Sequence, residues 1–186
     1  MTCIVGLVDE SGNVYIGGDS CASTGYVEQT LAFSKVFRQG DFLIGYSGSV
    51  RMLQLLQYAF TPPEHPADMS IECYFSTLFV DELRNVLKDK GNAYKQNEQE
   101  STPGYFLIGY RGRLFTVSSD YSLTEVAEGH LIATANRVEA LGALFATHSM
   151  SLIPQKRIEL ALEAASHFCR GVGEPFHIEC LHGESV

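Results

Sequence analysis

The order of strand-like and helix-like segments constrains the fold of this chain more than any other feature of its sequence. Runs rich in β-branched and aromatic residues come first, followed by two segments with apolar residues at helical spacing. Strand-like runs then return, and two more helical segments and a last strand complete the chain. The predicted strands span residues 2–8, 13–18, 35–37, 42–46, 105–110, 114–117, 130–134 and 176–181, and the predicted helices span 49–60, 71–90, 138–145 and 158–169.

This order does not fit repeated βαβ alternation. It suits two antiparallel sheets that pack face to face with helices on the outside. We therefore predict an α+β fold, built as a four-layer αββα sandwich. The chain has 186 residues, of which 45% are hydrophobic, so we expect a single domain over residues 1–186. The polar stretch 92–103 and the polar segment leading through Gly25 are predicted to be loops, the former exposed and mobile.

Composition argues against several classes of function. The net charge is −9 and no block of Lys and Arg is present, which argues against a nucleic-acid partner. No apolar run approaches the roughly 20 residues that cross a bilayer, and the first residues lack a basic targeting segment, so we expect a cytoplasmic protein with no membrane partner. The cysteines form no C-x-x-C pair and the histidines no H-E-x-x-H motif, so no catalytic metal is expected.

The first residues offer a nucleophile. Removal of Met1 would give Thr2 a free α-amine, whose ordinary pKa of about 7.7–8.0 lets it accept a proton near neutral pH. The hydroxyl of Thr2 and its own base would then share one residue. An initial Met-Thr alone is more often just the start of a strand.

Three further motifs change that interpretation. They are Gly17-Gly18-Asp19 after the second predicted strand, Lys35 at the start of another strand, and Gly45-x-x-Gly48 before a helix. Together with Thr2 they resemble the proteasome β-subunits, and especially HslV, the peptidase of a bacterial ATP-dependent two-component protease. The spacings match within one inserted residue, and the resemblance covers nearly the whole chain.

The resemblance implies a role for each of these residues. Thr2 would be the nucleophile, and the Lys35 ammonium would favour the ionised hydroxyl, while Asp19 would hold Lys35 charged and oriented. The backbone N–H of Gly48 would stabilise the oxyanion. The positions that line the family's substrate pocket fall on uncharged residues, namely Ala22, Phe33, Tyr46 and Val50.

Two positions depart from the family pattern. The family has a Gly-Ser-Gly element whose serine supports the N-terminal amine, and this chain has Ala135-Asn136-Arg137 there. We expect Asn136 to take the place of that serine. A supporting carboxylate late in the penultimate helix is also replaced, with His167 nearest to it. The run Gly171-Val172-Gly173 lacks the lysine of a phosphate loop and is interpreted as a turn.

The function implied by the resemblance is a threonine-type amide hydrolase, a peptidase that works without a cofactor through an acyl-enzyme. The implied partners are peptide or protein substrates and further copies of the chain in a homo-oligomeric ring or stacked rings. The presence of an ATPase partner stays open. Two alternatives stay open at this point. One is an amidase that acts on a small-molecule amide, and the other is a catalytically inactive, proteasome-like assembly subunit.

Overall fold

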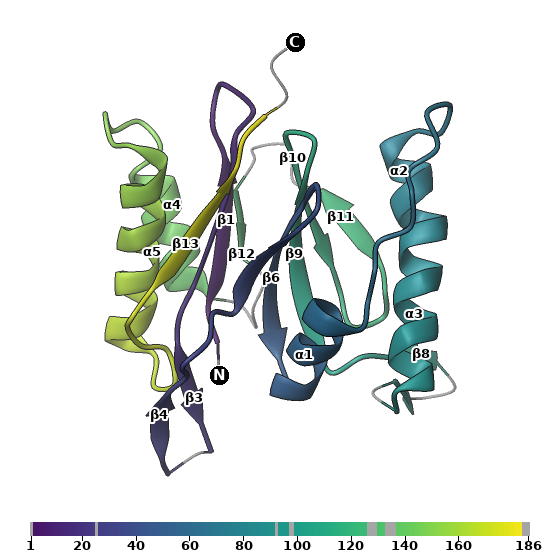
Figure 1. Cartoon of the computed structure of the whole chain (residues 1–186). Coiled ribbons are helices and arrows are strands. Elements are labelled where there is room, and N and C mark those ends of the chain that lie inside the picture. Colours follow the sequence, from purple (N-terminus) through teal and green to yellow (C-terminus); the bar gives the residue numbers. More distant parts are fainter. Residues whose placement is uncertain are drawn as a thin grey trace.

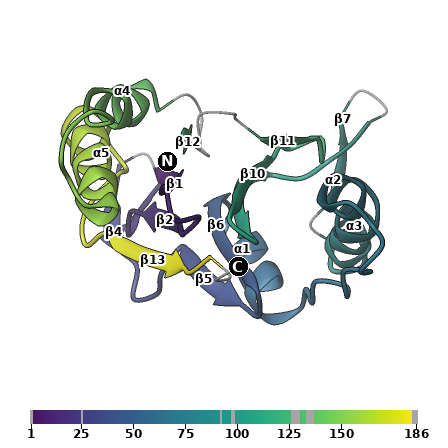
Figure 2. The same cartoon turned by 90° about the horizontal axis from the view of Figure 1, so that it is seen from above.

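The computed structural model describes residues 2–24, 26–91, 93–96, 99–125, 130–132 and 137–183. Two β-sheets stand side by side in the middle of the molecule, with helices on both outer sides (Figure 1). The view from above shows the same arrangement, with α4 and α5 against one sheet and α2 and α3 beyond the other (Figure 2). The predicted α+β class is confirmed.

Both sheets are antiparallel. The first has the strand order β12-β1-β2-β13, with bounds His130–Ile132, Ile4–Val8, Val14–Gly18 and His177–Leu181. The second has the order β11-β10-β9-β6-β5, with bounds Leu123–Glu125, Arg113–Val117, Gly104–Tyr110, Phe42–Gly48 and Val36–Gln39.

The helices follow the predicted segments closely. Ser49 caps α1 by accepting a hydrogen bond from the N–H of Met52, and Pro154 occupies the first turn of α5, where its missing N–H costs nothing. The predicted helix over 71–90 has the expected extent but contains a π-helical turn, η1, between α2 and α3. The bounds are Val50–Tyr58 for α1, Ile71–Tyr74 for α2, Phe75–Phe79 for η1, Val80–Asp89 for α3, Val138–Ala146 for α4 and Pro154–Phe168 for α5.

The apolar core consists of three layers of buried side chains. One lies between α4, α5 and the first sheet, one between the two sheets, and one between the second sheet and α1 to α3. The layer between the sheets is thin. A Cβ atom added to Gly45 would come within 2.6 Å of Ile4 and 2.7 Å of Ile16, so the glycine lets the sheets approach closely. This close approach brings the start of β5 to the strands of the other sheet.

Two predicted loops are wrong in part. Cys21–Ser23 and Glu28–Thr30 pair as β3 and β4 within the polar segment around Gly25. Tyr94–Gln96 and Gln99–Ser101 pair as β7 and β8 within the stretch predicted to be a mobile loop. These hairpins are held by backbone hydrogen bonds between polar strands, which leave no apolar period in the sequence. The short strand β11 was missed for the same reason.

Across the described ranges, no helix combines the length and the apolar character needed to cross a bilayer.

Candidate active site

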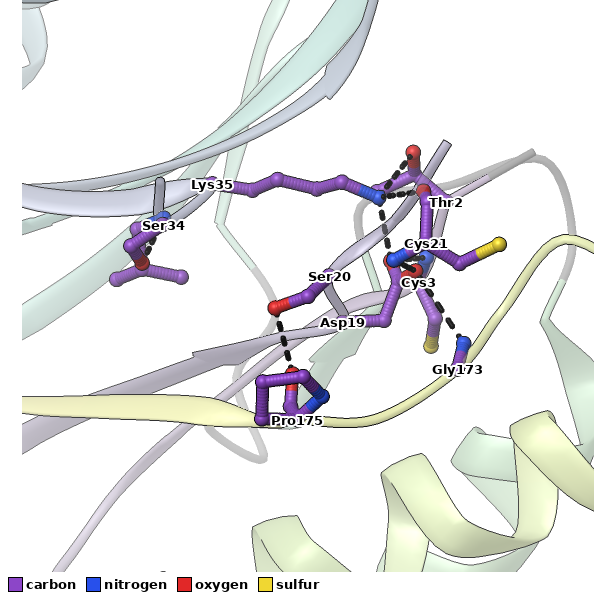
Figure 3. Close-up of polar contacts among 10 residues, drawn as sticks. Thr2, Cys3, Asp19, Ser20, Cys21, Ser34, Lys35, Gly173 and Pro175 are labelled. Carbon is purple, nitrogen blue, oxygen red and sulfur yellow. Dashed lines mark hydrogen bonds and ion pairs between the residues drawn. The ribbon is translucent and has the colours of Figure 1, made fainter. Parts of the chain in front are cut away.

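Three segments of the chain meet at the N-terminal end of β1. Thr2 and Cys3 precede β1, Asp19 follows β2, and Lys35 precedes β5 of the other sheet. The N–H of Asp19 donates to the carbonyl of Cys3 at 3.2 Å, which fixes the end of β2 against the start of β1. Figure 3 shows the long side chain of Lys35 reaching across to Thr2 and Asp19.

The ammonium group of Lys35 has three acceptors around it. Its Nζ lies 3.1 Å from Oγ1 of Thr2, 2.9 Å from Oδ1 of Asp19 and 2.6 Å from the carbonyl oxygen of Cys21. An ammonium carries three donors, so all of them are used. The Lys35 side chain is only 7% exposed and the Asp19 side chain is fully buried. The positive charge is therefore held at a fixed place beside the Thr2 hydroxyl.

The carboxylate of Asp19 is oriented by the backbone. Its Oδ1 accepts from the N–H of Cys3 at 2.9 Å, and its Oδ2 accepts from the N–H of Cys21 at 2.9 Å and of Gly173 at 3.4 Å. A buried ion pair is stable only when its remaining hydrogen-bonding capacity is satisfied. Both oxygens of Asp19 meet this condition, so the carboxylate can hold Lys35 without a water molecule.

The turn after α5, which contains Gly173 and Pro175, also contacts the site. This role was not predicted from the sequence. Besides the N–H of Gly173 that reaches Asp19, the carbonyl of Gly173 accepts from the N–H of Ser20 at 3.0 Å. The hydroxyl of Ser20 donates to the carbonyl of Pro175 at 2.6 Å. These partners are more than 150 positions apart in sequence, so no local motif could have revealed them.

The two positions before Asp19 have no room for a side chain, which explains their glycines. A Cβ atom on Gly17 would collide with a methyl group of Ile158 in α5, and one on Gly18 would lie 2.8 Å from Ile4. Because both positions lack side chains, α5 can pack directly on β2 while β5 approaches from the other face. The two glycines thus let α5 and β5 pack against β2 immediately before Asp19.

Comparison with known proteins agrees with this architecture. No family model and no curated protein sequence matches the chain. Among solved structures, Thiobacillus denitrificans BPH in complex with epoxomicin is 23% identical, covers 98% of this chain and 100% of its own, and has a TM-score of 0.81. HslV from Trypanosoma brucei is 16% identical, with 97% and 99% coverage and a TM-score of 0.70. Anbu from Yersinia bercovieri is 14% identical, with 96% and 80% coverage and a TM-score of 0.63.

The chain has the HslV/proteasome-like fold. The resemblance inferred from Thr2, Asp19, Lys35 and the glycine motifs is confirmed at the level of the fold.

Gly48 ends β6, directly before Ser49, the N-cap of α1. A Cβ atom there would collide with the hydroxyl of Tyr46 and with the carbonyl oxygen of Pro103. The position therefore requires glycine. Its contribution to an oxyanion site stays a prediction.

The four expected pocket residues do not share one environment. Tyr46 is 2% exposed and packs on Phe106 in the layer beneath α1 to α3, because even-numbered side chains of β6 face those helices. Ala22 is half-buried on β3, while Phe33 and Val50 are 37% and 41% exposed. For all four residues the pocket role stays a prediction.

The two departures from the family pattern have different outcomes. Asn136 lies outside the described residues. Its neighbour Arg137 is described and buried, and the Nε of that side chain has no hydrogen-bond partner among the described residues. His167 lies exposed in the last turn of α5 with its ring edge-on to Phe168 at 4.7 Å.

The thiols beside the site are poor competitors for Thr2. Burial, with a smaller contribution from the charge of Asp19, raises the pKa of Cys3 to about 12. Burial also raises the pKa of Cys21. Both thiols therefore stay protonated at neutral pH and act as small apolar groups. Within the described ranges, no cluster of three or more His, Cys, Asp or Glu side chains is placed to hold a metal ion.

Proposed function

We propose that this chain is a threonine-type amide hydrolase, and within that class a peptidase, whose nucleophile is the hydroxyl of Thr2. One observation carries the proposal: Nζ of Lys35 lies 3.1 Å from Oγ1 of Thr2 and 2.9 Å from the buried carboxylate of Asp19. A surface ion pair would not align a buried charge with a hydroxyl at a strand end. The proposal includes one catalytic domain over residues 1–186, framed as an αββα sandwich.

The first step requires a free α-amine on Thr2, so the peptide bond to Met1 must be cleaved before turnover. The neutral amine takes the proton of the Thr2 hydroxyl while Oγ1 attacks the carbonyl carbon of the substrate amide. The carbonyl π electrons move to oxygen, and the N–H of Gly48 stabilises the resulting oxyanion. Asn136 would support the amine during this transfer.

The second step completes the reaction. The Thr2 ammonium returns its proton to the nitrogen of the leaving amine as the C–N bond breaks, which leaves an ester on Oγ1. Water, deprotonated by the same amine, then attacks the ester carbon. The bond from that carbon to Oγ1 breaks, Oγ1 takes the proton back from the ammonium, and the acid is released. Every proton transfer uses the Thr2 amine, so the reaction needs no cofactor.

The charge of Lys35 makes the first step feasible. Its ammonium stabilises negative charge on Oγ1 as the proton leaves, and burial reduces screening by water. Asp19 does not touch the substrate in this scheme. It is a positioning residue that keeps Lys35 charged and directed at Thr2.

Assembly of several copies is part of the proposal. Val138, Leu141 and Phe145 are 63%, 45% and 74% exposed and lie at i, i+3 and i+7 along α4, so they form one apolar stripe on the outer face. We propose that this stripe is buried between copies in a ring or stacked rings. Light scattering should show an oligomer, and Phe145→Glu should shift it toward the monomer. A monomer at all concentrations would contradict this part.

Peptide hydrolysis tests the central proposal. The protein with an intact-mass-verified Thr2 amine is assayed on casein, short peptide amides and small-molecule amides. Thr2→Ala should abolish turnover, whereas Thr2→Ser should retain some because the hydroxyl and the amine both remain. Epoxomicin, which BPH of Thiobacillus denitrificans binds, is a useful probe and should bind the wild type more tightly than Thr2→Ala.

The same assay separates the alternatives. Cleavage of small amides without cleavage of casein would identify a small-molecule amidase, and a free Thr2 amine without any turnover would favour an assembly subunit. Turnover with Met1 still attached would refute the threonine mechanism. Stimulation of casein hydrolysis by an ATPase would extend the proposal to a two-component protease.

The uncharged side chains at the four proposed pocket positions, Ala22, Phe33, Tyr46 and Val50, should favour neutral or apolar residues next to the cleaved bond. A peptide library in which Arg, Lys, Asp or Glu dominates that position would overturn this assignment.

A further inference from the structure

A polar pocket is lined by residues of α3 and β8. Figure 1 shows α3 on the opposite side of the second sheet from the start of the chain. The pocket has a volume of about 460 Å³, which is within the range of small-ligand sites. Its walls come from η1, α3, β8 and the turn between β10 and β11. The lining residues are Ser76, Val80, Asp81, Arg84, Glu100, Asp120, Tyr121 and Ser122.

Two of the residues that line this pocket each carry a buried oxygen atom with no hydrogen-bond partner among the described residues. One is the hydroxyl of Tyr121, a residue that is 7% exposed, and the other is Oε1 of Glu100. The second oxygen of Glu100 accepts from Nη2 of Arg84 at 3.0 Å. Leaving a buried polar atom unpaired is unfavourable. Each of the two oxygens can accept a hydrogen bond from a donor that enters the pocket.

The ring of Tyr121 is held in place by its own turn. Tyr121 has a φ of 66°, in the left-handed region, and its N–H donates to the carbonyl of Ser118 at 2.9 Å. The guanidinium of Arg84 lies 5.8 Å from the centre of the ring. Burial, helped by the charge of Glu100, raises the pKa of Tyr121 to about 12, so the hydroxyl is neutral at physiological pH.

The charges around the pocket favour a cation. Three carboxylates line it, on Asp81, Glu100 and Asp120, against the single guanidinium of Arg84. Arg84 is already bound to Asp81 at 3.3 Å and to Glu100 at 3.0 Å. Hydrogen bonds from Ser122 lower the pKa of Asp120, which keeps that carboxylate ionised. An anion would thus meet repulsion from these carboxylates.

An organic cation fits these groups better than a metal ion. No set of described His, Cys, Asp and Glu side chains here has the arrangement of a metal site. An ammonium or guanidinium group is a donor without acceptor atoms, so it can satisfy two oxygens at once. The exposed carboxylates of Asp81 and Asp120 at the rim offer a place for a second positive charge.

We propose that this pocket binds a small organic dication of the alkyl diamine or aminoalkyl guanidine class. One cationic group lies between Oε1 of Glu100 and the hydroxyl of Tyr121. The other lies at the rim near Asp81 and Asp120. This site does not depend on the chemistry of Thr2.

Isothermal titration calorimetry of the full chain tests the proposal with putrescine and agmatine as probes. We expect saturable binding of one molecule per chain, and no binding of 1,4-butanediol, which has the same carbon skeleton as putrescine without the charges. Tyr121→Phe and Glu100→Gln should each weaken binding about tenfold or more, since each removes a contact with a charged group. Thr2→Ala should bind as the wild type does.

Asp89→Asn is the matched control. Like Glu100→Gln it removes one negative charge, but Asp89 lies at the end of α3 and does not line the pocket. It should leave the affinity unchanged. Thermal melts verify that each variant is folded. If Glu100→Gln does not fold, Asp81→Asn replaces it, because the Asp81 side chain is 65% exposed. This substitution should weaken binding only by removing a negative charge at the rim.

Four results would overturn the proposal. They are no saturable binding of either probe, equal weakening by Asp89→Asn and Glu100→Gln, unchanged affinity in Tyr121→Phe, or displacement of putrescine by an equal concentration of MgCl2. Equal weakening by Asp89→Asn and Glu100→Gln would mean that general charge attraction explains the binding. Displacement by MgCl2 would indicate a simple ion site.

Discussion

The Thr2 site and the Tyr121 pocket are both built on a carboxylate paired with a basic side chain, but only the first is complete within the chain. Both oxygens of Asp19 and all three donors of Lys35 have partners. In the pocket, Oε1 of Glu100 and the hydroxyl of Tyr121 have none among the described residues. A saturated network fixes a charge in place for chemistry, whereas an unsaturated one is suited to take up a ligand.

The largest expected effect is on turnover. Lys35→Ala should lower the rate of amide hydrolysis by about a thousandfold or more, because it removes the charge that stabilises the ionised Thr2 hydroxyl in a site shielded from water. Steady-state kinetics on a peptide amide measures the loss. Lys156→Ala removes a lysine whose side chain is 43% exposed, and it should leave the rate unchanged. An active Lys35→Ala protein would remove the basis for regarding this site as catalytic.

The next effect is on stability. Asp19→Asn should lower the free energy of unfolding by about 3 kcal/mol, because it leaves the Lys35 ammonium buried without its counter-charge. Urea denaturation measures this change. Glu159→Gln breaks the exposed pair with Lys156 and should have no measurable effect. Equal stability of Asp19→Asn and wild type would mean that water enters the site and screens the pair.

A smaller effect is expected at the end of β6. Gly48→Ala should destabilise the protein by about 1–3 kcal/mol, since the added methyl group would collide with the Pro103 carbonyl and the Tyr46 hydroxyl. In α4 a Cβ atom on Gly142 meets nothing within 4 Å, so Gly142→Ala should stabilise the helix by up to about 1 kcal/mol. Thermal denaturation of the two variants checks the opposite signs, and a stable Gly48→Ala would show that this junction adjusts.

The smallest effect sharpens the contrast between the two regions. Without ligand, Tyr121→Phe should change the free energy of unfolding by less than about 1 kcal/mol, because the hydroxyl that it removes makes no hydrogen bond to the described chain. Tyr46→Phe is the control, since its hydroxyl donates to the carbonyl of Pro103 at 3.3 Å. Saturating putrescine should raise the melting temperature of the wild type more than that of Tyr121→Phe. A large loss in Tyr121→Phe without ligand would show that the hydroxyl is already satisfied.

The order of the main elements was predictable from the sequence, because apolar spacing reports which face of a strand or helix is buried. That information sufficed for the α+β class and for most bounds of the large strands and helices. Thr2, Asp19 and Lys35 could be selected as a set only because their spacing resembles a known family.

Tertiary structure decided what local spacing does not encode. The polar hairpins β3–β4 and β7–β8 are stabilised by backbone pairing, and the burial of Tyr46 follows from the face of β6 that meets the helices. The carbonyl of Cys21 and the N–H of Gly173 complete the site through contacts that no side-chain pattern records. The Tyr121 pocket likewise exists only because the chain brings α3, β8 and a turn together. Periodicity in a sequence specifies burial one segment at a time, whereas a site depends on distances between atoms of different segments, and only the packed chain fixes those distances.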